Sequence, residues 1–263
     1  MRRHFAMILV FIRNSVQNEF AYRVNLIVSV LLTLVGMVGA VGAVLVVYSH
    51  ASSIQGWTLT ETLALLGLFS IMSGLLNTFI SPNLDQFAEN VRQGTLDFVL
   101  LKPVNSQFLV SFQRCVVWGL ADVVAGAAVL VYALASGMGE GVGVGDVLAF
   151  GLAAAAGTAI IYSLWVSLAT VAFWTVKIDN MTTILRAFFE MGRFPVDVYP
   201  LWLRRALTYL VPIAFVTTTP VEALGGRSGP VVLTVAVLLA GAMLYASTRL
   251  WRLGLSQYTS ASS

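Results

Sequence analysis

The chain has 263 residues, of which 58% are hydrophobic and only 10% are charged. An average soluble domain carries about 25% charged residues, so this composition excludes an ordinary water-soluble domain and indicates an integral membrane protein. The formal net charge of +3 is too small to indicate nucleic-acid binding, and the single cysteine, Cys115, excludes an internal disulfide.

The segment before the first long apolar run predicts a helix at the membrane surface. Residues 1–22 place apolar side chains at three- and four-residue spacing, with polar residues between them. A simpler interpretation is that this interfacial helix only anchors the first span. No compact apolar run with a cleavage site follows Arg2 and Arg3, so we expect the N-terminus to be retained rather than removed as a signal peptide.

Long apolar runs predict the transmembrane helices, each of which needs about 20 mostly apolar residues. Five runs meet this requirement, at 24–48, 60–80, 110–135, 147–176 and 231–248. Small residues within the runs let helices approach each other closely. We expect such close approaches, within the chain or between two copies of it, at Gly36, Gly39, Ala40 and Ala43, and at Gly151, Ala155 and Ala159.

The basic residues are distributed unevenly between the loops. The N-terminal segment, the loop 81–109 and the C-terminal tail carry lysine and arginine, whereas the loops 49–59 and 136–146 carry none. Cytoplasmic loops are enriched in these residues, so both termini and the loop 81–109 are predicted to be cytoplasmic. Two termini on the same side require an even number of spans, which indicates six and leaves one to be found between Lys177 and Pro230.

The region 179–226 is interrupted by four prolines: Pro195, Pro200, Pro212 and Pro220. In one topology, residues 178–205 are cytoplasmic and 206–224 cross the membrane, which the positive-inside rule favours because the arginines then lie inside. In the other, a short helix at 178–193 crosses, and 195–226 form re-entrant helices in the outer leaflet that protein or water must surround. The residues alone leave both topologies open.

The loop 81–107 contains a short amphipathic helix with a predicted cap at each end. Ser81 is expected to cap its start, and Gly94 suits the left-handed residue that ends it, just after Arg92 in the last turn. One apolar face is formed at helical spacing by Leu84, Phe87, Ala88 and Val91. A passive linker has no need of two caps, so we interpret this helix as a docking surface; the alternative is a helix that merely lies on the bilayer.

The chain lacks the motifs of common nucleotide-binding and hydrolytic sites. A P-loop needs glycines followed by Gly-Lys-Ser or Gly-Lys-Thr, and neither Lys102 nor Lys177, the two lysines, fits this pattern. His4 and His50 have no metal-ligand spacing, and no Gly-x-Ser-x-Gly segment is present. We therefore expect no enzyme activity and no cofactor or metal on this chain.

A signature follows the capped helix. Gly94, Thr95, Leu96 and Asp97 are followed by Leu100, Leu101, Lys102 and Pro103, a Gly-Thr-Leu-Asp…Leu-Leu-Lys-Pro pattern. The proline-rich stretch 193–224 and the segment 18–25 add to it, and essentially the whole chain resembles a permease subunit of the ABC transporter type-2 exporter family. More narrowly, it resembles the six-span branch that carries this loop signature.

The resemblance implies an all-α integral membrane fold with six transmembrane helices, and it implies the second topology, with a short fifth span and re-entrant helices. It also implies a second permease, alike or different, in a bacterial inner membrane, and export of drug-like or natural-product compounds. A cytoplasmic ABC ATPase dimer, which binds the ATP and Mg, would dock on the coupling loop 81–107. The docking residues would be Leu84, Phe87, Ala88, Val91, Arg92, Gly94, Asp97 and Lys102. An ion-coupled secondary transporter and a non-transporting membrane scaffold remain as alternatives.

Charged residues within the predicted spans are candidates for a substrate path, because a charge at membrane depth costs about 2.5–3.5 kcal/mol on insertion scales. Asp122 lies mid-span, and an unpaired carboxylate there would favour a cationic substrate. Arg186 and Glu190 are four residues apart on one face of the predicted fifth helix and can pair. We expect that ion pairing fixes the helix packing; the alternative is that these three residues contact substrate directly.

Overall fold

The computed structural model describes residues 23–102, 105–139, 141–175 and 179–258. These ranges are helical apart from loops, and one isolated bridge between Ile54 and Trp57 is their only strand pairing. The long helices are α2 (Arg23–Tyr48), α3 (Leu59–Leu75), α7 (Gly119–Ala133), α8 (Val144–Thr170) and α12 (Pro230–Gln257). The shorter ones are α4 (Ser81–Arg92), α5 (Asp97–Leu100), α6 (Ser106–Phe112), α9 (Asp179–Glu190), α10 (Leu201–Arg205) and α11 (Thr218–Leu224). The predicted interfacial helix, residues 1–22, lies outside the described residues.

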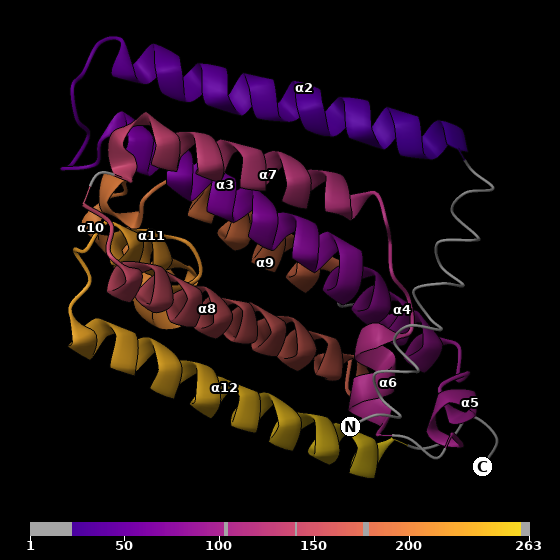
Figure 1. Cartoon of the computed structure of the whole chain (residues 1–263). Coiled ribbons are helices and arrows are strands. Elements are labelled where there is room, and N and C mark those ends of the chain that lie inside the picture. The colour runs from indigo at the N-terminus through magenta and orange to yellow at the C-terminus, as the bar shows by residue number, and fades with distance from the viewer. Residues whose placement is uncertain (1–22, 103–104, 140, 176–178, 259–263) are drawn as a thin grey trace.

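The long helices run side by side as one bundle (Figure 1). α2 and α12 lie on opposite flanks, with α3, α7 and α8 between them. α4, α5 and α6 gather at one end, and α10 and α11 at the other. We call these the α4–α6 end and the α10–α11 end.

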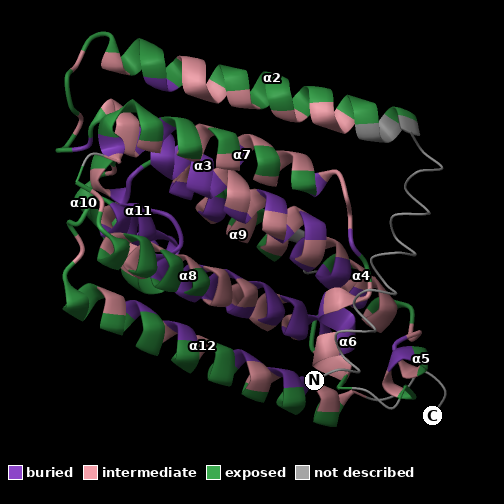
Figure 2. Ribbon diagram, in the orientation of Figure 1, coloured by how far each residue is buried: buried purple, intermediate pink, exposed green. Residues whose placement is uncertain are grey.

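Burial separates the helices into a centre and a periphery. In the apolar part of Leu59–Arg92, 72% of the residues are buried, against 6% in Ile27–Tyr48. Figure 2 shows the same contrast between a largely buried α3 and a largely exposed α2. The exposed face of α2 is nevertheless apolar, as expected of a helix whose surroundings are lipid or another membrane helix.

Glycines bring α3 and α7 into close contact. A Cβ atom at Gly126 would lie 2.5 Å from the carbonyl oxygen of Gly67, and one at Gly74 would lie 2.6 Å from that of Gly119. Only glycine leaves room for backbones this close. Among the positions expected from the sequence, Gly36, Gly39 and Gly151 have no atom of the described chain within 4 Å of the corresponding Cβ position, whereas Ala40 and Ala159 pack against the core.

The second predicted span does not stop at residue 80, because α3 runs through a π-helical turn, Leu76–Ile80, directly into α4. The predicted cap at Ser81 is therefore wrong: its hydroxyl donates to Asp85 Oδ2 at 3.2 Å inside a continuous helix. Pro82 has no N–H to donate to the carbonyl four residues before it. That carbonyl, of Thr78, instead accepts from the backbone N–H of Val116 at 3.0 Å.

The predicted end of this helix at Gly94 is confirmed. Gly94 has φ +68°, and α4 ends at Arg92. The N–H of Thr95 donates to the carbonyl of Asn90 at 2.9 Å, and the N–H of Gly94 donates to that of Val91 at 3.2 Å. These two bonds make a Schellman motif, which satisfies carbonyls that the last helical turn would leave without donors.

The predicted span 110–135 is wrong as one helix. α6 ends at Phe112, and α7 begins only at Gly119. The buried amide of Asn83 holds the break, because its Nδ2 donates to the Arg114 carbonyl at 2.7 Å and its Oδ1 accepts from the Arg114 N–H at 2.8 Å. A side chain therefore takes both backbone groups that an uninterrupted helix would use.

The number of helices that can cross a membrane depends on the proline-rich region. Five helices are long and apolar enough, and a sixth is obtained if Leu201–Leu210 and Ile213–Leu224, bent by 73°, count as one. α9 occupies the predicted fifth span, but its 12 residues measure only about 18 Å, short of the roughly 30 Å hydrocarbon core. The last predicted span, 231–248, is extended at its end, so Arg249 and Arg252 lie within α12.

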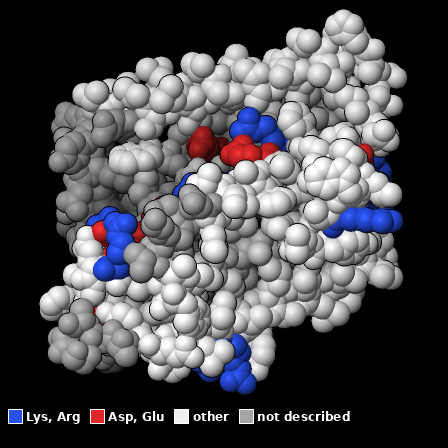
Figure 3. All heavy atoms as spheres, turned by 180° about the vertical axis from the view of Figure 1, so that it is seen from behind, with Lys and Arg blue, Asp and Glu red and all other residues white. Residues whose placement is uncertain are grey.

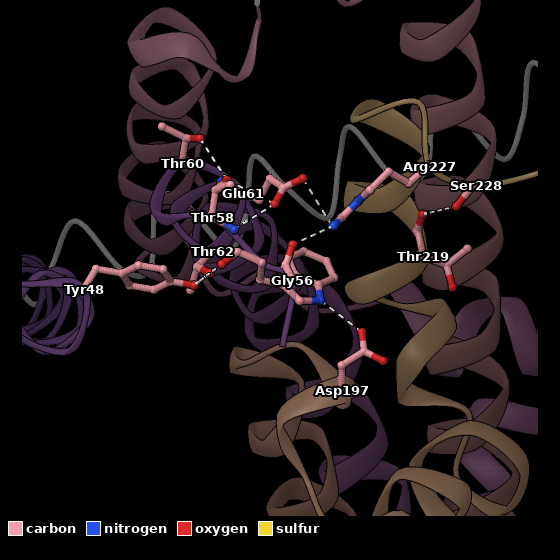
Figure 4. A network of polar contacts seen from close by, with 11 residues as sticks. Tyr48, Gly56, Thr58, Thr60, Glu61, Thr62, Asp197, Thr219, Arg227 and Ser228 are labelled. Atoms are coloured by element: carbon pink, nitrogen blue, oxygen red, sulfur yellow. Dashed lines mark hydrogen bonds and ion pairs between the residues drawn. The ribbon is translucent and has the colours of Figure 1, made fainter. Parts of the chain in front are cut away.

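Residues 195–226 lie at the α10–α11 end as short helical pieces, which fit either a broken span or re-entrant helices. A polar network ties them to the start of α3 (Figure 4). Arg227 pairs with Glu61 at 3.3 Å and donates to the Gly56 carbonyl at 3.1 Å, and Trp57 Nε1 donates to Asp197 at 3.0 Å. Glu61 also completes the capping box of α3 with Thr58.

Two of the arginines at this end, Arg204 and Arg227, have acidic partners. Arg204 pairs with Asp197 at 2.6 Å and Arg227 with Glu61. Counting lysine and arginine alone, as the positive-inside rule does, leaves such partners out of account.

Candidate functional site

A cavity of about 330 Å³ lies between α2 and α3; we call it the α2–α3 cavity. Its polar lining comes from three helices and the turn after α9, and consists of Thr33, Ser70, Ser73, Asp122 and Arg193. Leu66 and Phe69 of α3 add apolar surface. The lining thus combines one carboxylate, one guanidinium and three hydroxyls with apolar walls, a composition suited to an amphiphilic ligand.

Asp122, predicted as a substrate-path residue, does line this cavity. Its Oδ1 accepts a hydrogen bond from the Thr33 hydroxyl at 2.8 Å, which links α7 to α2. The carboxylate therefore has a partner, and Arg193 lines the same space. A preference for cationic substrates, expected of an unpaired carboxylate, does not follow from this arrangement.

The predicted pair of Arg186 with Glu190 is not formed. Glu190 pairs with Arg193 at 2.9 Å, while Arg186 pairs with Asp85 at 3.4 Å and also donates to the Ser81 hydroxyl. Helical spacing permits a pair at i and i+4, but Arg186 finds its partner on α4, and Glu190 pairs instead at i and i+3 with Arg193 in the turn that follows α9. Arg186 thereby links α9 to the first turn of α4 and lies away from the α2–α3 cavity.

Arg193 is the cavity residue that the sequence did not single out. It follows α9 in a 3₁₀ turn, its guanidinium lies 5.3 Å from the ring centroid of Phe69, and its Nε is buried with no partner among the described residues. Its position two residues before the helix-breaking Pro195 was the available signal. Figure 3 shows, from behind, acidic and basic groups meeting on an otherwise largely uncharged face.

The apolar face of α4 is turned into the bundle. Leu84 and Phe87 are buried, and the Phe87 ring packs against Trp251 of α12 and Phe173 after α8, with centroid separations of 4.8 and 5.3 Å. These two predicted docking residues therefore hold α4, α8 and α12 together within the chain. Ala88, Val91, Gly94 and Asp97 are partly buried, whereas Arg92 and Lys102 are exposed.

Two large apolar side chains are instead exposed at the tip of the α4–α6 end. Phe98 in α5 is 72% exposed and Leu101 is 80% exposed. They flank a buried Val99, so they are held by a packed turn. Asp97 lies beside Tyr258 at the end of α12. The pKa of the Tyr258 hydroxyl is raised, mainly by its burial and also by the negative charge of Asp97. The tip thus carries a carboxylate near the end of α12 and presents apolar surface outward.

No group of three His, Cys, Asp or Glu side chains among the described residues could hold a metal ion.

The sequence was compared with known protein families, curated proteins and solved structures. A family profile described as ABC-2 family transporter protein matches residues 34–262. This match confirms the family resemblance predicted from the loop signature and the proline-rich stretch. No curated protein and no solved structure matches the chain at a significant level.

Proposed function

The chain belongs to the ABC-2 family of transporter proteins, and from this premise we propose that it is the permease subunit of an ATP-driven exporter. In this proposal a cytoplasmic ABC ATPase dimer binds the ATP and Mg, and a second permease, identical or different, completes the path. The system lies in a bacterial inner membrane with both termini cytoplasmic and exports drug-like or natural-product compounds. The largely uncovered α2 supports a further partner, because it leaves an apolar face for the second permease or for lipid.

The observation that carries this proposal is the continuity of α3 and α4. A partner that moves the α4–α6 end also moves α3, because Leu59–Arg92 is one unbroken helix. α3 in turn lines the α2–α3 cavity through Leu66, Phe69, Ser70 and Ser73. The Phe87 contacts extend the same motion to α12. A displacement at the tip is therefore transmitted mechanically to the proposed substrate path.

Phe98 and Leu101 are the proposed apolar anchors of the ATPase. Exposed apolar side chains on a rigid turn are the usual centre of a protein interface, and the exposed Arg92 and Lys102 supply a basic rim. We therefore assign docking to the outer surface of the loop 81–107 rather than to Leu84 and Phe87.

Replacing Phe98 or Leu101 by aspartate tests this assignment. We expect the affinity of the purified chain for its partner ABC ATPase to fall about 30-fold or more, as for loss of a central apolar anchor. Association is measured by titration in detergent, and folding by the melting temperature of the chain alone. Val144→Asp is the matched control, because Val144 is 79% exposed at the start of α8, at the opposite end of the bundle. Unchanged association of the Phe98→Asp/Leu101→Asp double variant would contradict the docking proposal.

The α2–α3 cavity is the proposed substrate path, with Asp122 and Arg193 selecting the charge of the ligand. Asp122→Asn removes a negative charge and is expected to weaken binding of the lipophilic cation tetraphenylphosphonium. Arg193→Gln is expected to strengthen cation binding and to weaken that of the anion tetraphenylborate, each by about five- to tenfold. Equilibrium dialysis with the assembled complex measures both ions, and Arg252→Gln at the far end of α12 is the control. If both ions bind all variants equally, the cavity is not the path.

A further inference from the structure

A second cavity, of about 520 Å³, lies at the α10–α11 end, between α10, α11 and the first turns of α12. We call it the α10–α12 pocket. Its volume lies within the range of pockets that hold small molecules or headgroups. Four charged residues line it, Asp197, Arg204, Arg205 and Glu222, and its apolar lining includes Val231 and Val235 of α12.

Both carboxylate oxygens of Asp197 already have partners within the protein. One carboxylate oxygen accepts from Trp57 Nε1 at 3.0 Å, and the other pairs with Arg204 at 2.6 Å. Its side chain is only 17% exposed, so a ligand in the pocket would find its oxygens occupied. Arg204 is 51% exposed and retains donors beyond this one contact.

The carboxylate of Glu222, unlike that of Asp197, is open to a ligand. Glu222 is half-buried in the pocket wall, and no hydrogen bond or ion pair reaches its carboxylate from the residues that the structure describes. Arg227, the neighbouring cation, is held by Glu61, by the Gly56 carbonyl and by the ring of Trp57, whose centroid lies 4.6 Å away. A carboxylate partly removed from water without a donor is costly. Glu222 is thus a ready acceptor for a donor from a ligand.

Positive charge also lines the α10–α12 pocket. Arg205 is exposed and has no hydrogen bond or ion pair with any described residue. Together with the remaining donors of Arg204 it suits a phosphate, which guanidinium groups bind well. With Glu222 supplying the negative charge, the pocket is complementary to a zwitterion, since a purely cationic ligand would face Arg205 and a purely anionic ligand would face Glu222.

The surroundings indicate that the zwitterion is attached to acyl chains. Trp202 and Tyr209, on the segment that carries Arg204 and Arg205, are 71% and 82% exposed. Aromatic side chains of this kind mark the headgroup level of a membrane. From the pocket, α12 continues with an exposed apolar face at Val231, Val235 and Leu238. A headgroup in the pocket would therefore place its acyl chains along α12.

We propose that the α10–α12 pocket binds a membrane phospholipid whose headgroup carries a primary amine, as in phosphatidylethanolamine. Its ammonium donates to Glu222, its phosphate accepts from Arg204 and Arg205, and its acyl chains lie on α12. This site is separate from the α2–α3 cavity and from the ATPase-docking tip. Lipid binding here requires only that the chain lies in a bilayer. The lipid proposal can therefore be tested independently of the proposed transport function.

Lipid selectivity of the native chain is the first test, because it needs no variant. The full chain is reconstituted in nanodiscs of phosphatidylcholine, and phosphatidylethanolamine, its mono- and dimethylated forms and phosphatidylglycerol are titrated in, with native mass spectrometry as the readout. We expect binding to fall stepwise as N–H donors are lost, by about tenfold between phosphatidylethanolamine and phosphatidylcholine. Equal retention of all these lipids would overturn the proposal. So would retention of diacylglycerol, titrated in as a further lipid without a phosphate, at the level of phosphatidylethanolamine.

Two charge-removing variants then assign the contacts. Glu222→Gln is expected to abolish the preference for the primary amine while binding of phosphatidylglycerol rises. Arg205→Gln is expected to weaken every phosphate-bearing lipid several-fold. Glu89→Gln and Arg252→Gln, both outside the pocket, are matched controls that leave selectivity unchanged. If Glu222→Gln keeps the amine preference, or if tetraphenylphosphonium displaces the lipid from native chain and Arg205→Gln alike, the pocket is not a zwitterion site.

Discussion

Replacing Gly126 by valine is expected to destabilise the bundle by about 3 kcal/mol or more, enough to prevent recovery of folded protein from the membrane. A Cβ atom there would lie 2.5 Å from the Gly67 carbonyl oxygen and 2.8 Å from the Ile71 backbone nitrogen. Both are backbone atoms of α3, so no side-chain rotation can make room. The helices would have to separate along a contact that includes the Gly74–Gly119 pair.

The comparison with Gly151→Val isolates this effect. Gly151 is also within a long apolar helix, but no atom lies within 4 Å of its Cβ position. The added side chain is then expected to change the melting temperature in detergent by only a degree or two. Equal melting temperatures for the two variants would show that α3 and α7 are not in close backbone contact in the protein.

Hydropathy predicted where most of the membrane helices lie because it depends on composition over about 20 residues, which local contacts barely alter. The boundaries depended on single interactions that composition does not contain. Asn83 is an ordinary polar residue in the sequence, yet its amide holds both backbone groups of Arg114 and divides the predicted span 110–135. Ser81 has the right chemistry for a cap, but the apolar turn before it stays helical.

The candidate sites show the same division. Asp122 was identifiable because a carboxylate inside an apolar run is costly, and it does line a cavity. The partners of Arg186 and Glu190 could not be identified from the sequence, because each side chain binds a residue that the i, i+4 spacing does not indicate. The apolar face of α4 was recognised correctly as a face, but periodicity does not say what covers it. The structure shows that the chain itself covers Leu84 and Phe87.

Phe87→Ala is therefore expected to act on stability and not primarily on docking. The Phe87 ring is fully buried between Trp251 and Phe173, and removing it leaves a cavity where α4, α8 and α12 meet. Such a truncation costs about 3–5 kcal/mol, and Phe87→Asp would cost more, since it buries an unpaired charge. Thermal unfolding of the chain without its partner measures this effect.

Leu101→Ala provides the matched comparison. Leu101 is 80% exposed, so its truncation should leave the melting temperature unchanged while weakening association with the ATPase. The two variants thus separate folding from docking: one lowers the melting temperature in the absence of the ATPase, and the other lowers affinity in a fully folded chain. If Phe87→Ala melts like the native chain yet fails to bind the ATPase, the inner face of α4 is itself the docking surface. α4 must then swing away from Trp251 when the partner binds.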